Sequence, residues 1–426
     1  MLFSFHRRTV LFAVLFTALV IAPSCITGRS GASARRGRTS GALSATAPAR
    51  VPEWAELRLP LELLADAAAD RRNVVLSPFG LSGALGMAAL GARGETLAQL
   101  DAAAGTGSDP TAIAERAADT RAALFEAAEE DGADFTAADS LWTHGKRTPL
   151  PDFARRLKEG FDAEVLAFGP SPADSVNRWI ARKTDGAIRD AASGGIPPDA
   201  QAALVDAVRF KARWAVPFER ERTAVGTFFP GTGTPQSVRF MNLLADFDVT
   251  RSPRAETIDI PYRGNRFRMR IVLPARGVLL QSLIYGWLRG ESAFPGSEPD
   301  ATATREELAL SLPKFSFESS TDVADALRRL GAKDAFDPSR ADFSGMFAPG
   351  PDPFFVGGVF QRAVIETDER GTTASAATSV SIGCAVPAGP EPFVVDRPFA
   401  FFLLGPENEV LFVGAVFDAA AAQAED

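Results

Sequence analysis

The sequence predicts one large domain of the mixed α+β class. The chain has 426 residues, of which 46% are hydrophobic, so it can bury an ample core. Helical periodicity dominates its first half and strand-like runs dominate its second half, which is typical of helices and strands that segregate along a chain. Residues 53–418 contain neither an internal repeat nor a linker-like stretch, so the sequence favours a single domain over two.

Residues 1–25 have the form of an export signal. Two arginines precede an apolar run from Val10 to Ala22, which is shorter than the roughly 20 residues that a bilayer-spanning helix needs. The run ends in the letters APSC, so Cys25 resembles a lipidation site, although Ala22 and Pro23 are unusual there. Two outcomes stay open: lipidation with membrane anchoring through Cys25, or simple cleavage. We expect the protein to be exported and to be extracellular, periplasmic or a membrane-tethered lipoprotein.

Residues 26–52 predict a flexible tether, because they are rich in Gly, Ser, Ala and Arg and have no periodicity. Up to Pro52 the chain holds seven arginines and no acid, whereas the remainder holds 38 basic and 53 acidic residues, a formal net charge of -15. An acidic body disfavours nucleic-acid binding. The basic tether is either solvated or able to lie against anionic lipid.

The residue inventory argues against most enzyme classes. Only His6 and His144 exist, and no G-x-S-x-G, H-E-x-x-H or P-loop pattern accompanies them. The neighbours of His144, in WTHGKRTP, predict a surface turn. Cys25 and Cys384 cannot build a disulfide framework. We therefore expect neither an enzyme nor a metal or cofactor site.

The elements follow in order along the chain. Leu and Ala at helical spacing predict helices in residues 54–72 and 81–105, with Gly105 as a stop. Residues 257–274 predict a hairpin that turns at Gly264 and Asn265, and residues 398–417 predict two apolar strands around a Gly-Pro turn. The stretch LALSLPKFSFES predicts one strand with an edge or bulge at its proline.

Residues 367–393 form a run of small residues between two strand-like stretches. Even positions from Thr372 to Ile382 are Thr, Ala, Ala, Thr, Val and Ile, while the odd positions are Thr, Ser, Ala, Ser and Ser. This is the alternation of a strand, yet Gly371 opens the run and prolines close it. The segment can form a strand without being obliged to do so.

Six motifs carry a resemblance to a known family. In chain order they read NVVLSPFGLSGALGMAALGARGET, FKARWAVPF, LPKFSFES, LRRLGAKDAFDPSRADFSGM, DERGTTASAAT, and DRPFAFFLL followed by VLFVGAVF. The chain resembles a serpin, a serine protease inhibitor, over residues 53–420, with a short disordered tail at 421–426. The resemblance implies three β-sheets, eight or nine helices, and an exposed reactive-centre loop that a target protease cleaves. The cleaved loop then inserts into the main sheet and distorts the acyl-linked protease.

The resemblance assigns the loop's hinge and its reactive bond. The hinge begins at Glu369, continues through Gly371, and has small residues at the positions that enter the sheet, namely Thr372, Ala374, Ala376 and Thr378. Insertion of roughly 14 residues at about 3.3 Å each needs such side chains, because slow insertion lets the protease hydrolyse the acyl-enzyme and escape.

The reactive bond falls sixteen residues after Glu369 by the family's spacing, between Ala385 and Val386. A cut one residue later would place Pro387 after the bond, where its locked φ is poorly tolerated. A small residue before the bond suits the shallow pockets of elastase-like or subtilisin-like serine proteases and argues against trypsin-like targets.

The family's shutter, a hydrogen-bonded cluster beneath the point where the sheet opens, maps onto Ser77, Gly80, Asp206 and Gln361. Only the first residue keeps the family's type, since asparagine and histidine are replaced by Asp206 and Gln361. We expect the amide of Gln361 to pair with the carboxylate of Asp206.

The family's breach, at the top of the same sheet, maps onto Trp214, Lys314 and Glu369. We expect Lys314 and Glu369 to form a salt bridge, the alternative being two separately solvated charges.

Three functions compete. The first is an irreversible inhibitor that acts as a monomer and binds its target protease covalently. The second is a non-inhibitory serpin that acts as a binding protein. The third is a thiol-reactive surface protein using Cys384, which has no nearby Lys, Arg or His to activate its thiolate.

Overall fold

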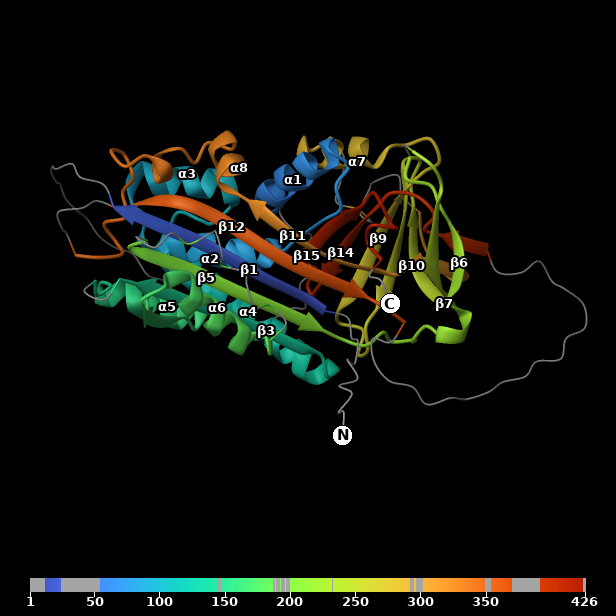
Figure 1. Ribbon diagram of the computed structural model, residues 1–426, viewed down its shortest axis with the longest axis horizontal. Coiled ribbons are helices and arrows are strands. Elements are labelled where there is room, and N and C mark those ends of the chain that lie inside the picture. Colours follow the sequence, from blue (N-terminus) through green and yellow to red (C-terminus); the bar gives the residue numbers. More distant parts are fainter. Residues whose placement is uncertain are drawn as a thin grey trace, which may run out of the picture.

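The fold is a long main sheet joined end to end with two smaller sheets (Figure 1). The computed structural model describes residues 12–23 and 54–423, with the exception of 145–146, 187, 189–191, 193–195, 197–199, 232, 292–294, 296–301, 349–353 and 370–390. Within these residues it has eight α-helices and three sheets, so the predicted α+β class and sheet number are confirmed.

The main sheet has six strands. In spatial order they are β11 (Phe315–Asp322), β12 (Phe354–Thr367), β1 (Phe12–Pro23), β5 (Ala202–Lys211), β3 (Asp134–Thr143) and β4 (Glu164–Ala167). Its four long central strands, β12, β1, β5 and β3, are antiparallel neighbours, and only β4 runs parallel to its partner β3.

The second and third sheets share one continuous hydrogen-bond network. The second consists of β13 (Glu391–Val394), β10 (Thr302–Pro313), β7 (Gln236–Arg251) and β6 (Ala224–Phe228). The third consists of β8 (Ala255–Pro261), β9 (Arg268–Pro274), β14 (Phe399–Leu404), β15 (Val410–Val416) and β2 (Val74–Leu76). Strand β7 belongs to both, because β10 pairs with residues 240–251 of β7, β6 pairs with residues 236–240, and β8 pairs with the last four residues, 248–251.

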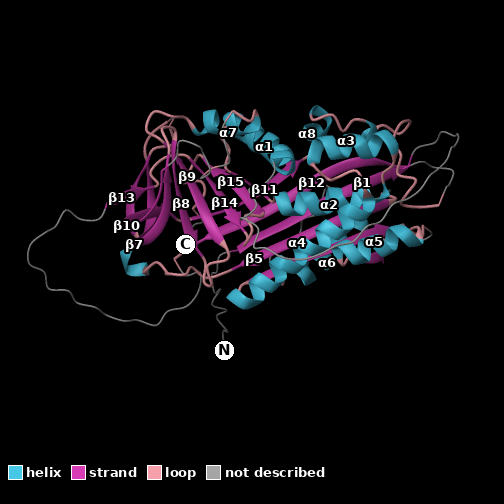
Figure 2. Ribbon diagram, turned by 180° about the vertical axis from the view of Figure 1, so that it is seen from behind, coloured by secondary structure: helices cyan, strands magenta, loops and turns pink. Residues whose placement is uncertain are grey.

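The helices lie on both faces of the main sheet and beside the third sheet (Figure 2). They are α1 (Trp54–Ala69), α2 (Pro78–Gly91), α3 (Gly94–Ala104), α4 (Pro110–Asp131), α5 (Pro151–Phe161), α6 (Pro172–Lys183), α7 (Leu280–Leu288) and α8 (Ala324–Arg329). Alternate residues of β5 contact opposite layers: Leu204 packs in the cluster that contains α2, and Val205 packs with Trp179 of α6. Because side chains of a strand alternate, odd-numbered residues of β5 face one layer of helices and even-numbered residues face the other.

Local sequence explains the helix boundaries. Helix α2 begins after Ser77, whose side chain accepts a hydrogen bond from the Gly80 amide, and Pro78 occupies the first turn. Gly105 ends α3 with a φ of 64°, which confirms the predicted stop. The predicted hairpin is also confirmed, since Gly264 and Asn265 have φ values of 90° and 68° between β8 and β9.

The stretch LALSLPKFSFES departs from its prediction. It is two strands rather than one, because β10 ends at Pro313 and β11 begins at Phe315 in a different sheet. Proline has no amide hydrogen to continue a ladder, and the chain crosses from the second sheet to the main sheet at Lys314. The break matters because it positions Lys314 between the two sheets.

The stretch predicted as an export signal contributes β1 to the centre of the main sheet. This strand runs antiparallel to β12 on one side and to β5 on the other. Thr17 lies opposite both Asp206 and Gln361, so these two residues occupy the same level of the sheet, one strand apart. None of the helices in the described part of the chain combines the length and apolarity that crossing a bilayer requires.

Candidate functional site

The predicted site divides into a loop, a breach and a shutter. The reactive bond Ala385–Val386 and the hinge residues Gly371, Thr372, Ala374, Ala376 and Thr378 lie outside the described residues, as do Cys25 and Cys384. The structure describes the two ends of this segment: β12 closes at Thr367 in the main sheet, and β13 opens at Glu391 in the second sheet. His144 is exposed, as its sequence neighbours predict.

The structure brings the three breach residues together at the end of β12. The Lys314 Nζ atom lies 3.2 Å from the Glu369 Oε2 atom, so the predicted ion pair is present. The indole nitrogen of Trp214 donates to the carbonyl oxygen of Asp368 at 3.0 Å. The Thr223 hydroxyl donates to the other Glu369 oxygen at 2.7 Å. Side chains from two segments, the β5–β6 connection and the β10–β11 junction, therefore hold Asp368 and Glu369, from which the hinge starts.

An aromatic platform supports the breach. The Trp214 ring stacks on Tyr262 with centroids 4.6 Å apart and an interplanar angle of 7°. Phe218 packs edge-on against Trp214, and its amide donates to the carbonyl oxygen of Glu369 at 3.1 Å. Thr223 and Tyr262 were not predicted, since neither belongs to the matching motifs and both reach the site only through folding.

Part of the predicted shutter is assembled. Gln361 on β12 accepts a hydrogen bond from the Ser77 amide and donates one to the Ser77 carbonyl, both at 3.1 Å. Both residues are buried, with Gln361 1% and Ser77 0% exposed. Gln361 therefore connects β12 to the first turn of α2, which lies under the centre of the main sheet.

The expected pair between Asp206 and Gln361 is not formed in this structure. Strand β1 lies between their strands. The Asp206 carboxyl group instead lies within hydrogen-bond reach of the Asp139 carboxyl group, directly opposite on β3. Asp139 in turn accepts a hydrogen bond at 2.6 Å from Arg121 of α4. The centre of the sheet thus holds two buried acids and one arginine.

These sheets and contacts match a known family. A family model described as serpin (serine protease inhibitor) matches residues 57–419. The chain belongs to the serpin family. Serpins are generally protease inhibitors rather than enzymes, although some are non-inhibitory.

Individual relatives match this chain over most of their own length. This serpin is similar to the leukocyte elastase inhibitor of Bos taurus, with 30% identity over 378 residues that cover 80% of this chain and 92% of the relative. It is 27% identical to a serpin-like protein of Methanosarcina acetivorans over 360 residues, 82% of each chain. The crystal structure of the thermophilic serpin tengpin in its native state has a TM-score of 0.72 and 26% identity, covering 86% of this chain and 93% of that one.

The pKa values of the two buried acids, Asp206 of the shutter and its neighbour Asp139, are raised. Burial raises the pKa of Asp206 well above its ordinary range, and the neighbouring Asp139 raises it further. Burial also raises the pKa of Asp139, although Arg121 opposes this effect. The two carboxyl groups repel each other when both are ionised, and this repulsion adds to the effect of burial on the pKa of Asp206.

The pKa values of two acids near the hinge, Glu369 and Glu366, shift in opposite directions. Burial tends to raise the pKa of Glu369, but the Thr223 hydrogen bond and the Lys314 charge outweigh it, so the pKa is lowered. Three residues earlier on β12, burial raises the pKa of Glu366 to about 7, and the charge of Asp368 adds to this. Glu369 is therefore ionised at neutral pH, whereas Glu366 gains or loses its proton near neutral pH.

Proposed function

We propose that this serpin is an irreversible suicide-substrate inhibitor of serine endopeptidases, with elastase-like or subtilisin-like targets. The observation that carries the proposal is the strand position between β12 and β5, which we call the insertion position. A loop that follows β12 and folds back beside it must run antiparallel to β12. Strand β1 occupies that position in that direction, so the sheet accommodates a twelve-residue strand there.

The N-terminal strand and the reactive loop compete for the insertion position. Residues 12–23 lie within the stretch that resembles an export signal, and we propose that export removes residues 1–24, with or without Cys25. Removal vacates the insertion position and leaves the loop as the segment of the same chain able to fill it. The inhibitor is accordingly the mature chain that begins at Cys25 or directly after it, and a chain that keeps β1 in place cannot insert its loop.

The proposed reaction is acyl transfer to the target protease that stops at the acyl-enzyme, before hydrolysis. The target's serine oxygen attacks the carbonyl carbon of Ala385, the bond to Val386 breaks, and the amine of Val386 leaves with the proton relayed by the target's histidine. The acylated segment then inserts beside β12 and carries the protease along the sheet. Small side chains at the hinge make this step fast enough to precede hydrolysis of the ester.

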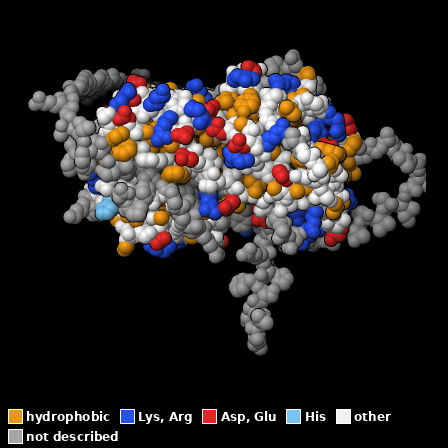
Figure 3. Space-filling model, turned by 45° about the horizontal axis from the view of Figure 1, so that its top comes forward, with side chains coloured by type: hydrophobic (Ala, Val, Ile, Leu, Met, Phe, Trp, Pro, Cys, Tyr) orange, Lys and Arg blue, Asp and Glu red, His pale blue; other side chains and the backbone are white. Residues whose placement is uncertain are grey.

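The acidic body and the basic tether support an exported monomer, without cofactor, whose partner is the protease. Lipidation at Cys25 would add membrane anchoring. On the face in Figure 3, basic and acidic side chains are interspersed, so this face offers no continuous basic surface to a nucleic acid.

The test is incubation of the mature chain with an elastase and with a subtilisin, followed by denaturing electrophoresis and mass spectrometry. We expect an SDS-stable complex and a released peptide that begins at Val386. The full chain that retains residues 12–23 is the matched control and should be cleaved without forming the complex. Cleavage of the mature chain with no complex for either protease would support the second candidate, a non-inhibitory serpin that acts as a binding protein.

A further inference from the structure

The connection between β5 and β6, residues 212–223, lies close to both ends of the segment that carries the reactive bond (Figure 1). At one end, the Thr223 hydroxyl donates to Glu369. At the other end, the Arg222 carbonyl accepts a hydrogen bond from Asn242 of β7, and β7 is two strand spacings, about 10 Å, from β13. A protease that grips the segment between these two ends therefore faces the connection.

Large apolar side chains are exposed on this connection and on the strand that follows it. Val216 is 48% exposed, Val225 of β6 is 70% exposed, and Phe229 is 47% exposed. Strand β6 contains no charged residue and pairs only with β7 among the described strands, so its other edge is open. Exposed apolar side chains beside an open, uncharged strand edge are typical of surfaces that bind another protein.

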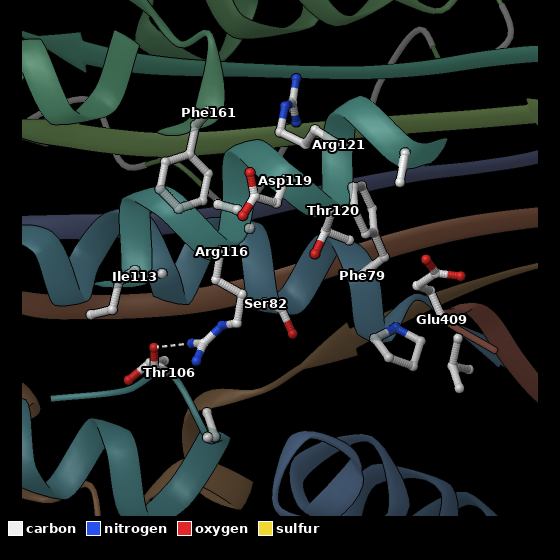
Figure 4. A pocket seen from close by; sticks show the side chains of 18 of the residues that line it. Phe79, Ser82, Thr106, Ile113, Arg116, Asp119, Thr120, Arg121, Phe161 and Glu409 are labelled. Carbon is white, nitrogen blue, oxygen red and sulfur yellow. Dashed lines mark hydrogen bonds between the residues drawn. The ribbon is translucent and has the colours of Figure 1, made fainter. Parts of the chain in front are cut away.

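Three arginines that border the breach have no acidic partner. Arg213 and Arg220 of the connection and Arg263 of the β8–β9 turn are exposed, and none forms an ion pair or a side-chain hydrogen bond within the described part of the chain. By contrast, Arg116 is engaged beside the cavity of about 640 Å³ under the main sheet, where it donates to the Thr106 carbonyl (Figure 4). The breach arginines thus carry charge that the fold does not use.

Two of these arginines are held directly opposite each other. Trp214 and Tyr262 form an antiparallel bridge, and beside it the Arg263 amide donates to the Arg213 carbonyl at 2.7 Å. Because side chains alternate along paired segments, Arg213 and Arg263 lie together on the face opposite to the buried Trp214 and Tyr262 rings. Like charges at such positions destabilise the pairing. An acidic group between the two arginines removes this repulsion and forms charge-assisted hydrogen bonds.

Acids near these arginines leave the positive charge in excess. Glu219 pairs with Arg222, and Asp131 beside the β8–β9 turn pairs with Arg266. Glu221 forms no ion pair among the described residues, so one unpaired acid stands against three unpaired arginines. The domain as a whole is acidic, but at physiological ionic strength the Debye length is about 8 Å, so the charges in contact with a partner dominate.

We propose that residues 213–229 and Arg263 form a docking surface for the target protease, and that this protease carries acidic residues beside its active-site cleft. It rests on the proposed inhibitory function and narrows the target class to elastase-like or subtilisin-like proteases with an acidic rim. The exposed valines supply apolar contact, and the arginines bind carboxylates of the partner. Docking here raises the rate of encounter with the loop and leaves the later insertion step unchanged.

The experiment measures kcat/KM for loop cleavage in the full chain, with a subtilisin whose cleft has an acidic rim and an elastase whose cleft has a basic rim. The double variant Arg213→Glu, Arg263→Glu should lower kcat/KM at least about tenfold for the subtilisin and raise it for the elastase. Arg182→Glu is the matched control, because Arg182 of α6 is equally exposed and unpaired among the described residues. That variant should stay within about twofold of the parent with both proteases.

Cleavage does not require loop insertion, so a failure of the proposed inhibition appears separately, as cleavage of the mature chain without an SDS-stable complex. No cleavage of the full chain by the subtilisin, or equal kcat/KM for the parent and the double variant, would overturn the docking surface. Equal losses in Arg182→Glu and the double variant would also overturn it, because net charge alone would then explain the effect. Lost binding to heparin at an unchanged cleavage rate would assign the arginines to a polyanion instead and would overturn the proposal.

Discussion

Strands β14 and β15 of the third sheet and strand β5 of the main sheet are buried to a similar degree but are built from different residues. Every residue of β14 and β15 is buried and apolar or glycine. Nine of the ten residues of β5 are also buried, yet they include Asp206 and Arg209, and Gln361 is buried on β12. A continuous apolar interior gains stability from every contact, whereas buried polar groups must find partners that change when strands separate. The comparison indicates that the third sheet stabilises the fold, whereas the polar groups buried in the main sheet accord with our proposal that its strands separate for insertion.

The largest expected effect concerns the filling of the main sheet. Cleavage of the reactive loop in the mature chain should raise the thermal midpoint by tens of degrees, because the cleaved segment can then complete the sheet. Calorimetry before and after limited proteolysis measures this change. The full chain with β1 in the insertion position is the control and should gain little. Equal thermal midpoints before and after cleavage of the mature chain would contradict insertion of the loop into the main sheet.

Next in size is a cavity in the third sheet. Phe401 is 0% exposed and packs with Phe315 at a ring-centroid distance of 5.3 Å. Phe401→Ala should lower the free energy of unfolding by about 3–5 kcal/mol. Denaturant unfolding followed by circular dichroism gives the value, and a loss below about 1 kcal/mol would show that this sheet is not the stabilising core.

Loss of the shutter amide should cost less. Gln361→Ala removes the acceptor of the buried Ser77 amide at 3.1 Å, whereas the Ser77 carbonyl keeps the Leu81 amide as a donor, so the expected cost is roughly 1–3 kcal/mol. Gln236→Ala is a matched control, because Gln236 also accepts one hydrogen bond and donates one, but at a partly exposed position. That variant should change stability by less than about 1 kcal/mol. Equal losses of stability in the two variants would contradict the view that the buried hydrogen bonds of Gln361 matter more than the partly exposed ones of Gln236.

The smallest expected effect is a dependence on pH. The folded-state pKa of Glu366 is about 7, above its ordinary value of 4.5. Between these values the native state binds more protons than the unfolded state, so stability falls as pH rises and the loss is complete above the folded-state pKa. Glu366→Gln should flatten this part of the curve in denaturant titrations between pH 5 and 8. Glu307→Gln, at an exposed position of β10, should leave the slope unchanged; an unchanged slope in Glu366→Gln would contradict the assignment.

Local and motif signals sufficed for most of the fold. The hairpin at Gly264 and Asn265 and the stop at Gly105 were predictable because each depends on a few adjacent residues with positive φ. The ion pair between Lys314 and Glu369 was predictable because both belong to motifs that the resemblance aligns.

Tertiary pairing explains what the sequence could not reveal. Asp139 meets Asp206 only through the register of β3 and β5, and Arg121 reaches Asp139 from α4. The separation of Asp206 from Gln361 depends on β1, a segment that pairs with strands about 200 and 350 residues away. The alternation within LALSLPKFSFES changes phase at Pro313, with leucines at 308, 310 and 312 before it and phenylalanines at 315 and 317 after it. A bulge within one strand and a crossing between two sheets both produce such a change of phase, so periodicity alone could not divide the stretch between two sheets.

The most direct test of insertion between β12 and β5 compares two neighbouring hinge variants of the mature chain. Thr372 belongs to the alternating set that must enter the sheet, and Thr373 belongs to the polar set that stays outward. The measurement is the fraction of cleaved inhibitor recovered as SDS-stable complex with the target protease. Thr372→Arg should be cleaved as a substrate with almost no complex, because its guanidinium must be desolvated on insertion, whereas Thr373→Arg should keep most of its complex. The same complex yield for both variants would contradict loop insertion into the main sheet.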